Sequence, residues 1–275
     1  MPVATEASSP AETWAFGIEI ECFMPADKVF TRGRYHHGRQ VRAIDRWTAE
    51  GWTAEADSSV VSDRPGFVGV EIVSPKLSGE QGLIEVVAMI DWLAEIGAYV
   101  NQRCGQHVSV DARGRSNDQV LAVRETFKAL ERGLYLVNGD QAAERWRNDY
   151  CTPLSSGRTA MAARYWGLNL VNYSSSNHDR KRLEFRLWAG TLDAAKTVSY
   201  ILTSVGFMAG VTAGDVPTPA EIPADALGQL RLLTHKYVIG HRMLPADKVS
   251  DLTDICRDMV TTGKAGVSGL VAVAR

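Results

Sequence analysis

Acidic side chains alternate with apolar ones in several segments of this 275-residue sequence, and they are the groups best suited to chemistry. Glu19 and Glu21 alternate with Ile18 and Ile20, so both carboxylates face the same side of an expected strand. Other polar groups stand opposite an apolar face in the same way: Glu71, His107, Asn169, Glu184 and Arg186. Carboxylates with one imidazole and no thiolate are a hard-ligand set, which favours Mg²⁺ or Mn²⁺ over structural zinc.

These groups form a single site if their strands share one sheet. Two carboxylates at i and i+2 lie about 6 to 7 Å apart on one face of a strand. Further negative charges beside them repel one another and raise the cost of folding, and bound divalent cations would remove that cost. The alternative is a charged solvent face, which is common in antiparallel sheets. Solvated faces typically mix Lys, Thr and Glu, whereas these segments supply almost only metal-ligand types, so together they favour a metal site.

The elements that must position these groups follow from hydrophobic periodicity and from turn residues. Strands are expected at residues 14–22, 52–61, 67–73, 99–111, 165–173 and 182–188. Helices are expected at residues 79–97, 117–137, 193–209, 224–237 and 246–261. Interspersed strands and helices, with strands joined in pairs, predict an α+β fold in which helices pack on one face of an antiparallel or mixed sheet.

Composition restricts the class of partner. Thirty Lys and Arg against 32 Asp and Glu leave a formal charge of -2, so the surface has no excess of cations for gripping nucleic acid. A nucleic acid is therefore expected at most as a substrate with a modified base. No run is expected to reach the roughly 18 to 20 apolar residues of a membrane span, and the first dozen residues do not resemble a signal peptide. These features predict a cytoplasmic protein without a membrane partner.

The basic stretch 28–46 follows the first expected strand directly. Gly33 and Gly38 indicate a loop in its first half, and its second half, up to Ala49, could be a helix. The stretch is either a solvated loop or a lid that closes over a nucleotide or an acidic substrate. Arg32 and Arg34 are the substrate-binding candidates in the second case.

Several motifs occur in an order that resembles a known family: FGIEIE at 16–21, ADSSV at 56–60, GVEIVSP at 69–75, CGQHVSV at 104–110, YWGLN at 165–169 and LEFRLWAGTLD at 183–193. They resemble the amidoligases, a branch of the carboxylate-amine ligases related to glutamine synthetase and glutamate-cysteine ligase. The resemblance covers roughly residues 14–209. It implies a curved, mainly antiparallel sheet with helices on its convex face, as in the glutamine synthetase catalytic domain.

The resemblance, together with the composition and patterning of the two ends, predicts a domain organisation. Residues 1–12 are expected to be a disordered lead-in, and residues 13–212 an amidoligase-like catalytic domain. Residues 213–275 are expected to form a C-terminal helical extension that packs on the same domain.

The resemblance assigns the metal ligands motif by motif. The first-strand Glu-x-Glu, Glu19 and Glu21, is implied to bind two different metal ions. The Gly-x-His motif supplies the imidazole of His107, and the Glu-x-Arg strand supplies the carboxylate of Glu184. Glu71 is implied to complete the other metal site.

The remaining motif residues are implied to contact the reactants. Arg186 faces the phosphates of ATP and, with Glu184, belongs to the catalytic group. Asp57 either supports the metal ligands from behind or helps to hold the amine substrate. Asn169 is either a nucleotide-binding group or a plain hydrogen-bonding residue of the strand.

The activity implied by the resemblance is an ATP- and Mg²⁺-dependent ligation. The γ-phosphoryl group of ATP converts a small-molecule or peptide carboxylate into an acyl phosphate, and an amine then displaces phosphate to form an amide or isopeptide bond. Two alternatives stay open: a metal-dependent hydrolase or nuclease that uses the same carboxylates, and a non-catalytic binding module with a degenerate site. The motifs specify neither the acid nor the amine.

Overall fold

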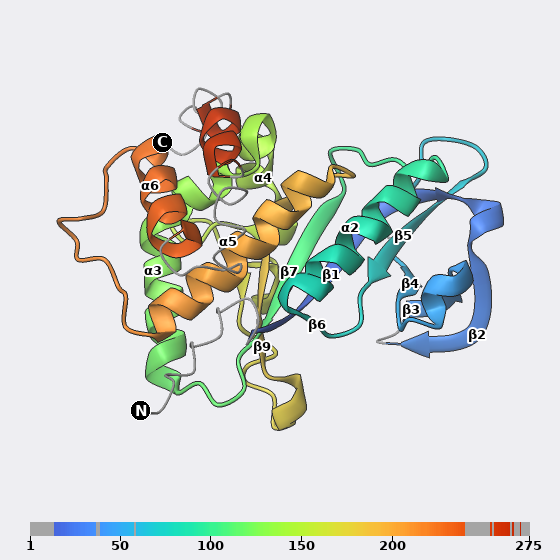
Figure 1. The fold of residues 1–275 in the computed structure, drawn as a ribbon, viewed down its shortest axis with the longest axis horizontal. Helices are drawn as coiled ribbons and strands as arrows, with labels where there is room; N and C mark the ends of the chain where they lie inside the picture. The colour runs from blue at the N-terminus through green and yellow to red at the C-terminus, as the bar shows by residue number, and fades with distance from the viewer. Residues whose placement is uncertain are drawn as a thin grey trace, which may run out of the picture.

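One antiparallel sheet organises the molecule (Figure 1). The computed structural model describes residues 14–36, 39–57 and 59–239, together with some residues between 254 and 270. Within these residues, nine strands form a single sheet in the order β2-β3-β4-β5-β1-β7-β9-β8, and β6 also pairs with β1. Each neighbouring pair is antiparallel. The predicted α+β fold is therefore confirmed.

The first long strand lies in the middle of the sheet, because it pairs with β5 on one side and with β7 on the other. The strands are β1 (Ala15–Pro25), β2 (Phe30–His36), β3 (Arg39–Ala43), β4 (Thr53–Ala56), β5 (Phe67–Val73), β6 (Leu77–Ser78), β7 (Gly105–Asp111), β8 (Leu168–Asn169) and β9 (Arg182–Ala189). The strands predicted at 52–61 and 165–173 are longer than the observed ones, because only 53–56 and 168–169 join the sheet.

The basic stretch 28–46 differs from the expected loop and helix. It forms the β2–β3 hairpin at the edge of the sheet, and β3 pairs with β4. This pairing places Val41 opposite Glu55 and leaves Val41 only 2% exposed. Burial of an apolar side chain against a neighbouring strand thus outweighs the local loop preference of the glycines.

The helices are close to the predicted ones. They are α2 (Gly79–Glu95), α3 (Asn117–Leu136), α4 (Ala142–Arg147), α5 (Ala194–Thr212) and α6 (Ala226–Leu233), which continues as a π-helical turn at Thr234–Ile239. Ser116 caps α3: its hydroxyl accepts from the backbone N–H of Gln119, and the Gln119 side chain accepts from the Ser116 N–H. Asp193 caps α5, because its Oδ1 atom accepts from the backbone N–H of Lys196.

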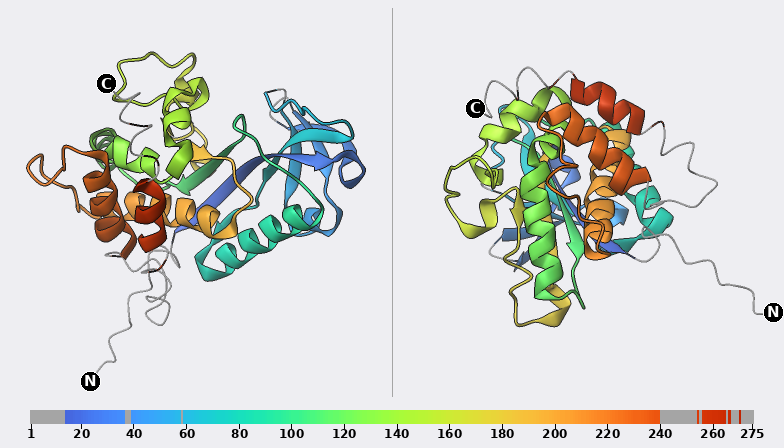
Figure 2. Two further views of the ribbon diagram at one scale, coloured as in Figure 1. Left: turned by 90° about the horizontal axis from the view of Figure 1, so that it is seen from above. Right: turned by 90° about the vertical axis from the view of Figure 1, so that its left-hand side faces the viewer.

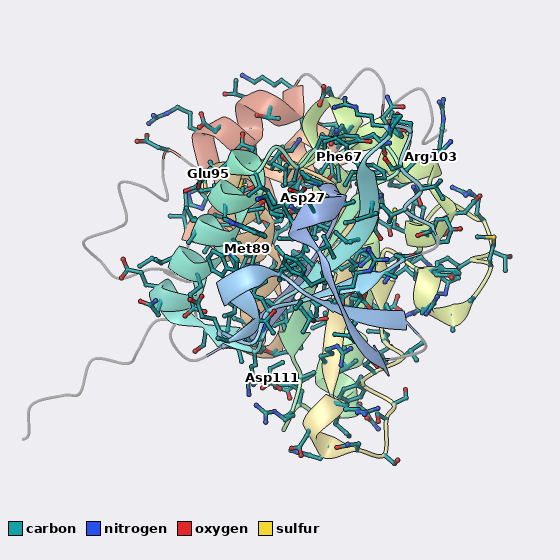
Figure 3. The ribbon with its side chains drawn as sticks, turned by 90° about the vertical axis from the view of Figure 1, so that its right-hand side faces the viewer. Asp27, Phe67, Met89, Glu95, Arg103 and Asp111 are labelled. Atoms are coloured by element: carbon teal, nitrogen blue, oxygen red, sulfur yellow. The ribbon has the colours of Figure 1, made fainter. Side chains whose placement is uncertain are left out.

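The helices leave one face of the sheet open. α2 and α5 lie together against the other face, whereas α4 and the chain after it rise on the open side (Figures 1 and 2). A view along the sheet shows Met89 and Glu95 of α2 on one side, and Phe67 and Arg103 on the opposite side (Figure 3). The core fills the space between helices and sheet and includes three rings from α3, β9 and α5 in mutual contact: Phe127, Phe185 and Phe207.

α5 corrects one sequence-based expectation. By length and composition it is apolar enough to cross a membrane, although no such segment was expected. However, 78% of its most apolar 18-residue window is buried inside the protein. Several of its hydroxyl groups donate to carbonyls of the same helix: Ser204, for example, donates to the carbonyl of Tyr200 and also accepts from the indole of Trp188. The apolar character of α5 follows from its position in the core.

α6, which follows α5 in the chain, packs against α3. Gln229 of α6 accepts a hydrogen bond from the backbone N–H of Gly133 in α3 at 3.1 Å. A Cβ at Gly133 would lie 2.6 Å from the Gln229 side chain, so only glycine permits this close approach. The described residues between 254 and 264 are helical. The lead-in at 1–12 and the first part of the helix predicted at 246–261 lie outside the described residues.

A buried carboxylate fixes the chain that rises on the open side. Glu131 of α3 is 1% exposed and accepts hydrogen bonds from the backbone N–H groups of Leu154 and Ser155, each at 2.7 Å. Burial raises the pKa of Glu131 from 4.5 to about 7, although these donors act in the opposite direction.

The raised pKa of Glu131 predicts a pH-dependent stability. The folded protein holds this proton more tightly than the unfolded chain, so the contribution of Glu131 to the free energy of unfolding decreases as pH rises from 4.5 to about 7. Glutamine does not titrate. The free energy of unfolding of the wild type minus that of Glu131→Gln should therefore be smaller at about pH 8 than at about pH 5 in urea denaturation. An equal difference at both pH values would show that burial does not shift this group.

Candidate active site

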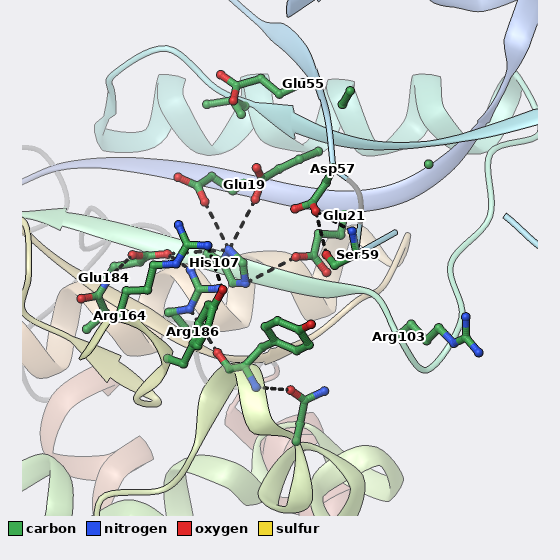
Figure 4. A pocket seen from close by; sticks show the side chains of 18 of the residues that line it. Glu19, Glu21, Glu55, Asp57, Ser59, Arg103, His107, Arg164, Glu184 and Arg186 are labelled. Carbon is green, nitrogen blue, oxygen red and sulfur yellow. Dashed lines mark hydrogen bonds and ion pairs between the residues drawn. The ribbon is translucent and has the colours of Figure 1, made fainter. Parts of the chain in front are cut away.

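Strand register places carboxylates in a row across the open face of the sheet. Glu21 of β1 lies directly opposite Glu71 of β5, and Glu71 lies opposite Glu55 of β4. On the other side of β1, Glu19 lies opposite His107 of β7. These residues line a cavity of about 1410 Å³ (Figure 4).

β9 adds the second part of the site. Glu184 lies opposite Asn169 of β8, and Arg186 stands two positions further along the same face. The side chains that alternate with them along β9 point into the core and are fully buried: Leu183, Phe185 and Leu187. Alternation along β9 therefore presents both Glu184 and Arg186 to the cavity.

His107 stands at the centre of four carboxylates. Its Nδ1 atom lies 3.2 Å from Glu19 Oε2, and 3.7 Å from both Glu71 Oε1 and Glu184 Oε1. Its Nε2 atom lies 3.8 Å from Glu21 Oε1. One imidazole cannot neutralise this many carboxylates, so the arrangement favours bound cations.

Two groups of side chains could each hold a metal ion. Glu19, Glu71 and His107 form one group, and Glu21, Asp57 and Glu71 form the other. Within each group the potential ligand atoms lie within 4.8 Å of one another. Glu71 belongs to both groups, so it could bridge two ions. Every donor is a carboxylate oxygen or an imidazole nitrogen, which fits Mg²⁺ or Mn²⁺.

Burial changes the titration of Glu21. Burial raises its pKa from 4.5 to about 7, while a hydrogen bond from the backbone N–H of Gly105 at 2.6 Å and the nearby Arg145 act against this shift. A Cβ at position 105 would lie 3.1 Å from the Arg145 guanidinium. Gly105 thus lets its backbone reach Glu21 without displacing the arginine.

Glu184 is held by two side chains. Asn169 Nδ2 donates to Glu184 Oε2 at 2.5 Å, and Arg186 Nη1 donates to Glu184 Oε1. The Asn169 side chain is itself oriented, because its amide oxygen Oδ1 accepts from the backbone N–H of Val171 at 2.9 Å. The structure thus gives Asn169 a direct contact with a candidate metal ligand. Arg186 also donates through Nε to the carbonyl oxygen of Tyr150 at 3.2 Å.

The sequence-predicted substrate residues have different outcomes. Asp57 follows β4 and lies in the second ligand group with Glu21, while its Oδ1 atom accepts from the backbone N–H and the hydroxyl of Ser59, each at 2.8 Å. Arg32 and Arg34 lie in β2, at the edge of the sheet, and their side chains are outside the described part of the structure.

Sequence reasoning missed two buried residues of the cavity. Glu55 lies two positions before Asp57 on an expected strand, so alternation could have identified it. Arg145 of α4 is 3% exposed and donates to the carbonyl oxygens of Arg186 at 2.7 Å and Leu187 at 3.2 Å. Arg145 thus holds the backbone of β9. No periodic pattern in the sequence predicts that its side chain reaches the cavity.

The cavity combines this acidic centre with cationic walls. Further arginines line it: Arg42, Arg103, Arg164 and Arg182. Carboxylates that hold divalent cations, surrounded by guanidinium groups, are suited to an anionic ligand that contacts the metal ions.

Comparison with solved structures identifies a similar fold. The chain resembles the ligase PafA in the crystal structure of its complex with the prokaryotic ubiquitin-like protein Pup, with a TM-score of 0.52 and 12% sequence identity. The similarity covers 95% of this chain and 65% of PafA, so this chain spans about two thirds of that ligase. The shared architecture is the open antiparallel sheet of the glutamine synthetase-like fold.

The sequence comparisons agree with the resemblance of the motifs. A search of curated proteins found no match. A family model described as "Putative amidoligase enzyme" matches residues 12–159, which include Glu19, Glu21, Glu71 and His107. Because this match extends over more than half of the sequence, the chain belongs to the amidoligase family.

Proposed function

We propose that this protein is an ATP- and Mg²⁺-dependent ligase that joins a carboxylate to an amine through an acyl phosphate. The observation that carries the proposal is the convergence of four glutamates on His107 beside Arg186, in a chain of the amidoligase family. A hydrolase would have less need for an arginine fixed beside the metal ligands.

Each ligand group has a defined part in the proposal. Glu19, Glu71 and His107 would hold one Mg²⁺, and Glu21 and Asp57, with Glu71 again, would hold another. Bound Mg²⁺ would neutralise the phosphate oxygens and align the γ-phosphoryl group for in-line transfer.

The arginine and glutamate of β9 act next to these ions. Arg186 would stabilise the negative charge on the transferred phosphoryl group. Its hydrogen bonds to Glu184 and to the carbonyl of Tyr150 fix the guanidinium before any reactant binds. Asn169 is a positioning residue in this proposal, because it orients Glu184.

The proposed chemistry explains why ATP is needed. A carboxylate does not react with an amine because its oxygen is a poor leaving group. In the first step a carboxylate oxygen attacks the γ-phosphorus, and ADP leaves. In the second step the amine attacks the acyl carbon, inorganic phosphate leaves with the bonding electrons, and the amine gives up a proton to the surroundings. The net products are an amide, ADP and phosphate.

A small-molecule or peptide carboxylate and an amine are the proposed substrates. The size of the cavity, about 1410 Å³, supports a nucleotide together with a second reactant, since typical small-molecule sites occupy about 300 to 1,000 Å³. The similarity to a ligase that is seen bound to Pup supports a peptide or protein as one of the reactants.

A screen for ADP release would test the proposed function. Pairs of acids and amines are incubated with the protein, ATP and Mg²⁺, and ADP is expected only with a productive pair. Mass spectrometry should detect a product lighter by one water than the sum of its parents. Glu184→Gln, which removes the charge of the carboxylate beside His107 that Arg186 and Asn169 hold, is expected to release no ADP.

Two results would contradict the proposal. One is the absence of Mg²⁺-dependent ATP binding to the wild type. The other is cleavage of a substrate bond without nucleotide, which would support the metal-dependent hydrolase instead.

A further inference from the structure

Two tyrosines stand at the wall of the cavity next to Arg186. Tyr150 and Tyr165 both line the cavity, and their rings make an edge-to-face contact with centroids 5.1 Å apart and an interplanar angle of 79°. Neither lies on the sheet. Both tyrosines belong to the chain that follows α4 and rises beside the sheet. Glu131 holds this chain by accepting hydrogen bonds from the backbone N–H groups of Leu154 and Ser155.

The backbone around Tyr150 is fixed on both sides. Its N–H donates to Asn148 Oδ1 at 2.8 Å, and its carbonyl oxygen accepts from Arg186 Nε at 3.2 Å. The neighbouring strand-like segment is tied down as well, because the Thr152 N–H donates to the carbonyl of Tyr165 at 2.7 Å. The backbone of Tyr150 is thus fixed in direct contact with the proposed phosphate-binding arginine.

The two rings differ in how much of their surface is available. The Arg164 guanidinium lies 4.9 Å from the ring centroid of Tyr165, and that of Arg186 lies 5.9 Å from it. Tyr150, in contrast, is 45% exposed. A large exposed aromatic ring at a ligand cavity is a suitable surface for another planar group.

The other aromatic residue among the described lining of the cavity is less suitable. Phe67 packs edge-to-face against Tyr99, with centroids 5.2 Å apart. It comes from β5, whereas the backbone carbonyl of Tyr150 accepts a hydrogen bond from Arg186 itself. A ligand with phosphates at Arg186 therefore meets Tyr150 first.

We propose that Tyr150 is the platform on which the adenine base of ATP stacks. The inference rests on the proposed function, because it places the phosphates at Arg186 and the metal ligands. Stacking on an aromatic side chain binds any base through its π-face, so the contact supplies affinity and fixes the direction of the nucleotide in the cavity. Arg186 contacts both Glu184 and the Tyr150 carbonyl, so it fixes the position of the base platform relative to the phosphate site.

The inference can be tested with two probes that share phosphates but differ in the base. Calorimetry measures the Kd of a non-hydrolysable ATP analogue and of inorganic tripolyphosphate, both with Mg²⁺. Tyr150→Ala is expected to raise the Kd of the ATP analogue by about 5- to 100-fold, because the base loses its stacking partner. It should leave the Kd of tripolyphosphate unchanged. Tyr150→Phe keeps the ring and should bind both probes like the wild type.

A matched control removes an exposed ring elsewhere. Phe30 is 51% exposed and does not belong to the lining of the cavity, so Phe30→Ala should leave both Kd values unchanged. Thermal melting of each variant checks that the fold is intact.

The outcomes separate the inference from the proposed function. If the wild type binds neither probe, the proposed function fails, and the inference fails with it. If the wild type binds both probes but Tyr150→Ala binds the ATP analogue normally, only the stacking inference is overturned. An equal loss of both probes in Tyr150→Ala also overturns it, since the ring would then act by positioning Arg186.

Discussion

Replacing Glu71 with glutamine is expected to lower the rate of Mg²⁺-dependent ADP release by about 10³-fold or more. Glu71 is 3% exposed, lies opposite Glu21 in the sheet and belongs to both candidate ligand groups. Glutamine keeps the shape of the side chain but removes the charge that would be shared between two ions. The loss of one carboxylate should therefore weaken both metal sites, whereas most of the other ligands serve a single site.

The metal content of the variant distinguishes this explanation from a general loss of structure. Mn²⁺ binding, followed by electron paramagnetic resonance, should show fewer bound ions in Glu71→Gln than in the wild type. Glu55→Gln is the matched control, because Glu55 is a buried carboxylate directly opposite Glu71 but lies outside both ligand groups. It is expected to keep the Mn²⁺ stoichiometry of the wild type. Unchanged Mn²⁺ binding and turnover in Glu71→Gln would exclude the shared-ligand arrangement.

Arg186→Ala is expected to slow ADP release by about 10² to 10³-fold while the protein stays folded. The guanidinium connects Glu184 with the carbonyl oxygen of Tyr150, so its removal takes away charge stabilisation and leaves both partners less well placed. Arg186→Lys keeps the charge but cannot make both contacts with a planar fork, so it should recover only part of the rate. Single-turnover measurements with saturating ATP would follow the chemical step.

Another arginine of the same strand provides the comparison for Arg186. Arg182 lies on the same face of β9, four positions earlier, and lines the same cavity. Arg182→Ala should reduce the rate less than Arg186→Ala, because the hydrogen bond to Glu184 remains in place. Equal effects of the two substitutions would indicate that overall positive charge, rather than the position of Arg186, matters.

The parts of the site that alternate along strands were predictable from the sequence. A period of two places Glu19 with Glu21 and Glu184 with Arg186, whatever the details of packing, because successive side chains of a strand face opposite sides. Which strands become neighbours is a non-local property. The pairing of Glu21 with Glu71 and of Glu19 with His107 could be proposed only on the assumption of a shared sheet.

Residues outside the sheet could not be predicted in this way. Arg145 lies in a six-residue helix, and Tyr150 in a short turn after it, where no periodicity distinguishes a cavity residue from a surface one. Their role depends on how α4 and its following chain approach β9. The β2–β3 hairpin was missed for a related reason, since pairing with β4 supplies the stability that its own glycine-containing sequence lacks.

The central place of β1 also has a consequence for synthesis on the ribosome. The first two metal-binding candidates emerge at positions 19 and 21. The strands β5 and β7, which pair with β1, end at positions 73 and 111, and β9, which pairs with β7, ends at position 189. While β9 is still inside the ribosome, the emerged part of the nascent chain lacks Glu184 and Arg186. The acidic residues of β1 are then still exposed. The growing polypeptide therefore cannot capture ions at a finished centre before most of its length has left the exit tunnel.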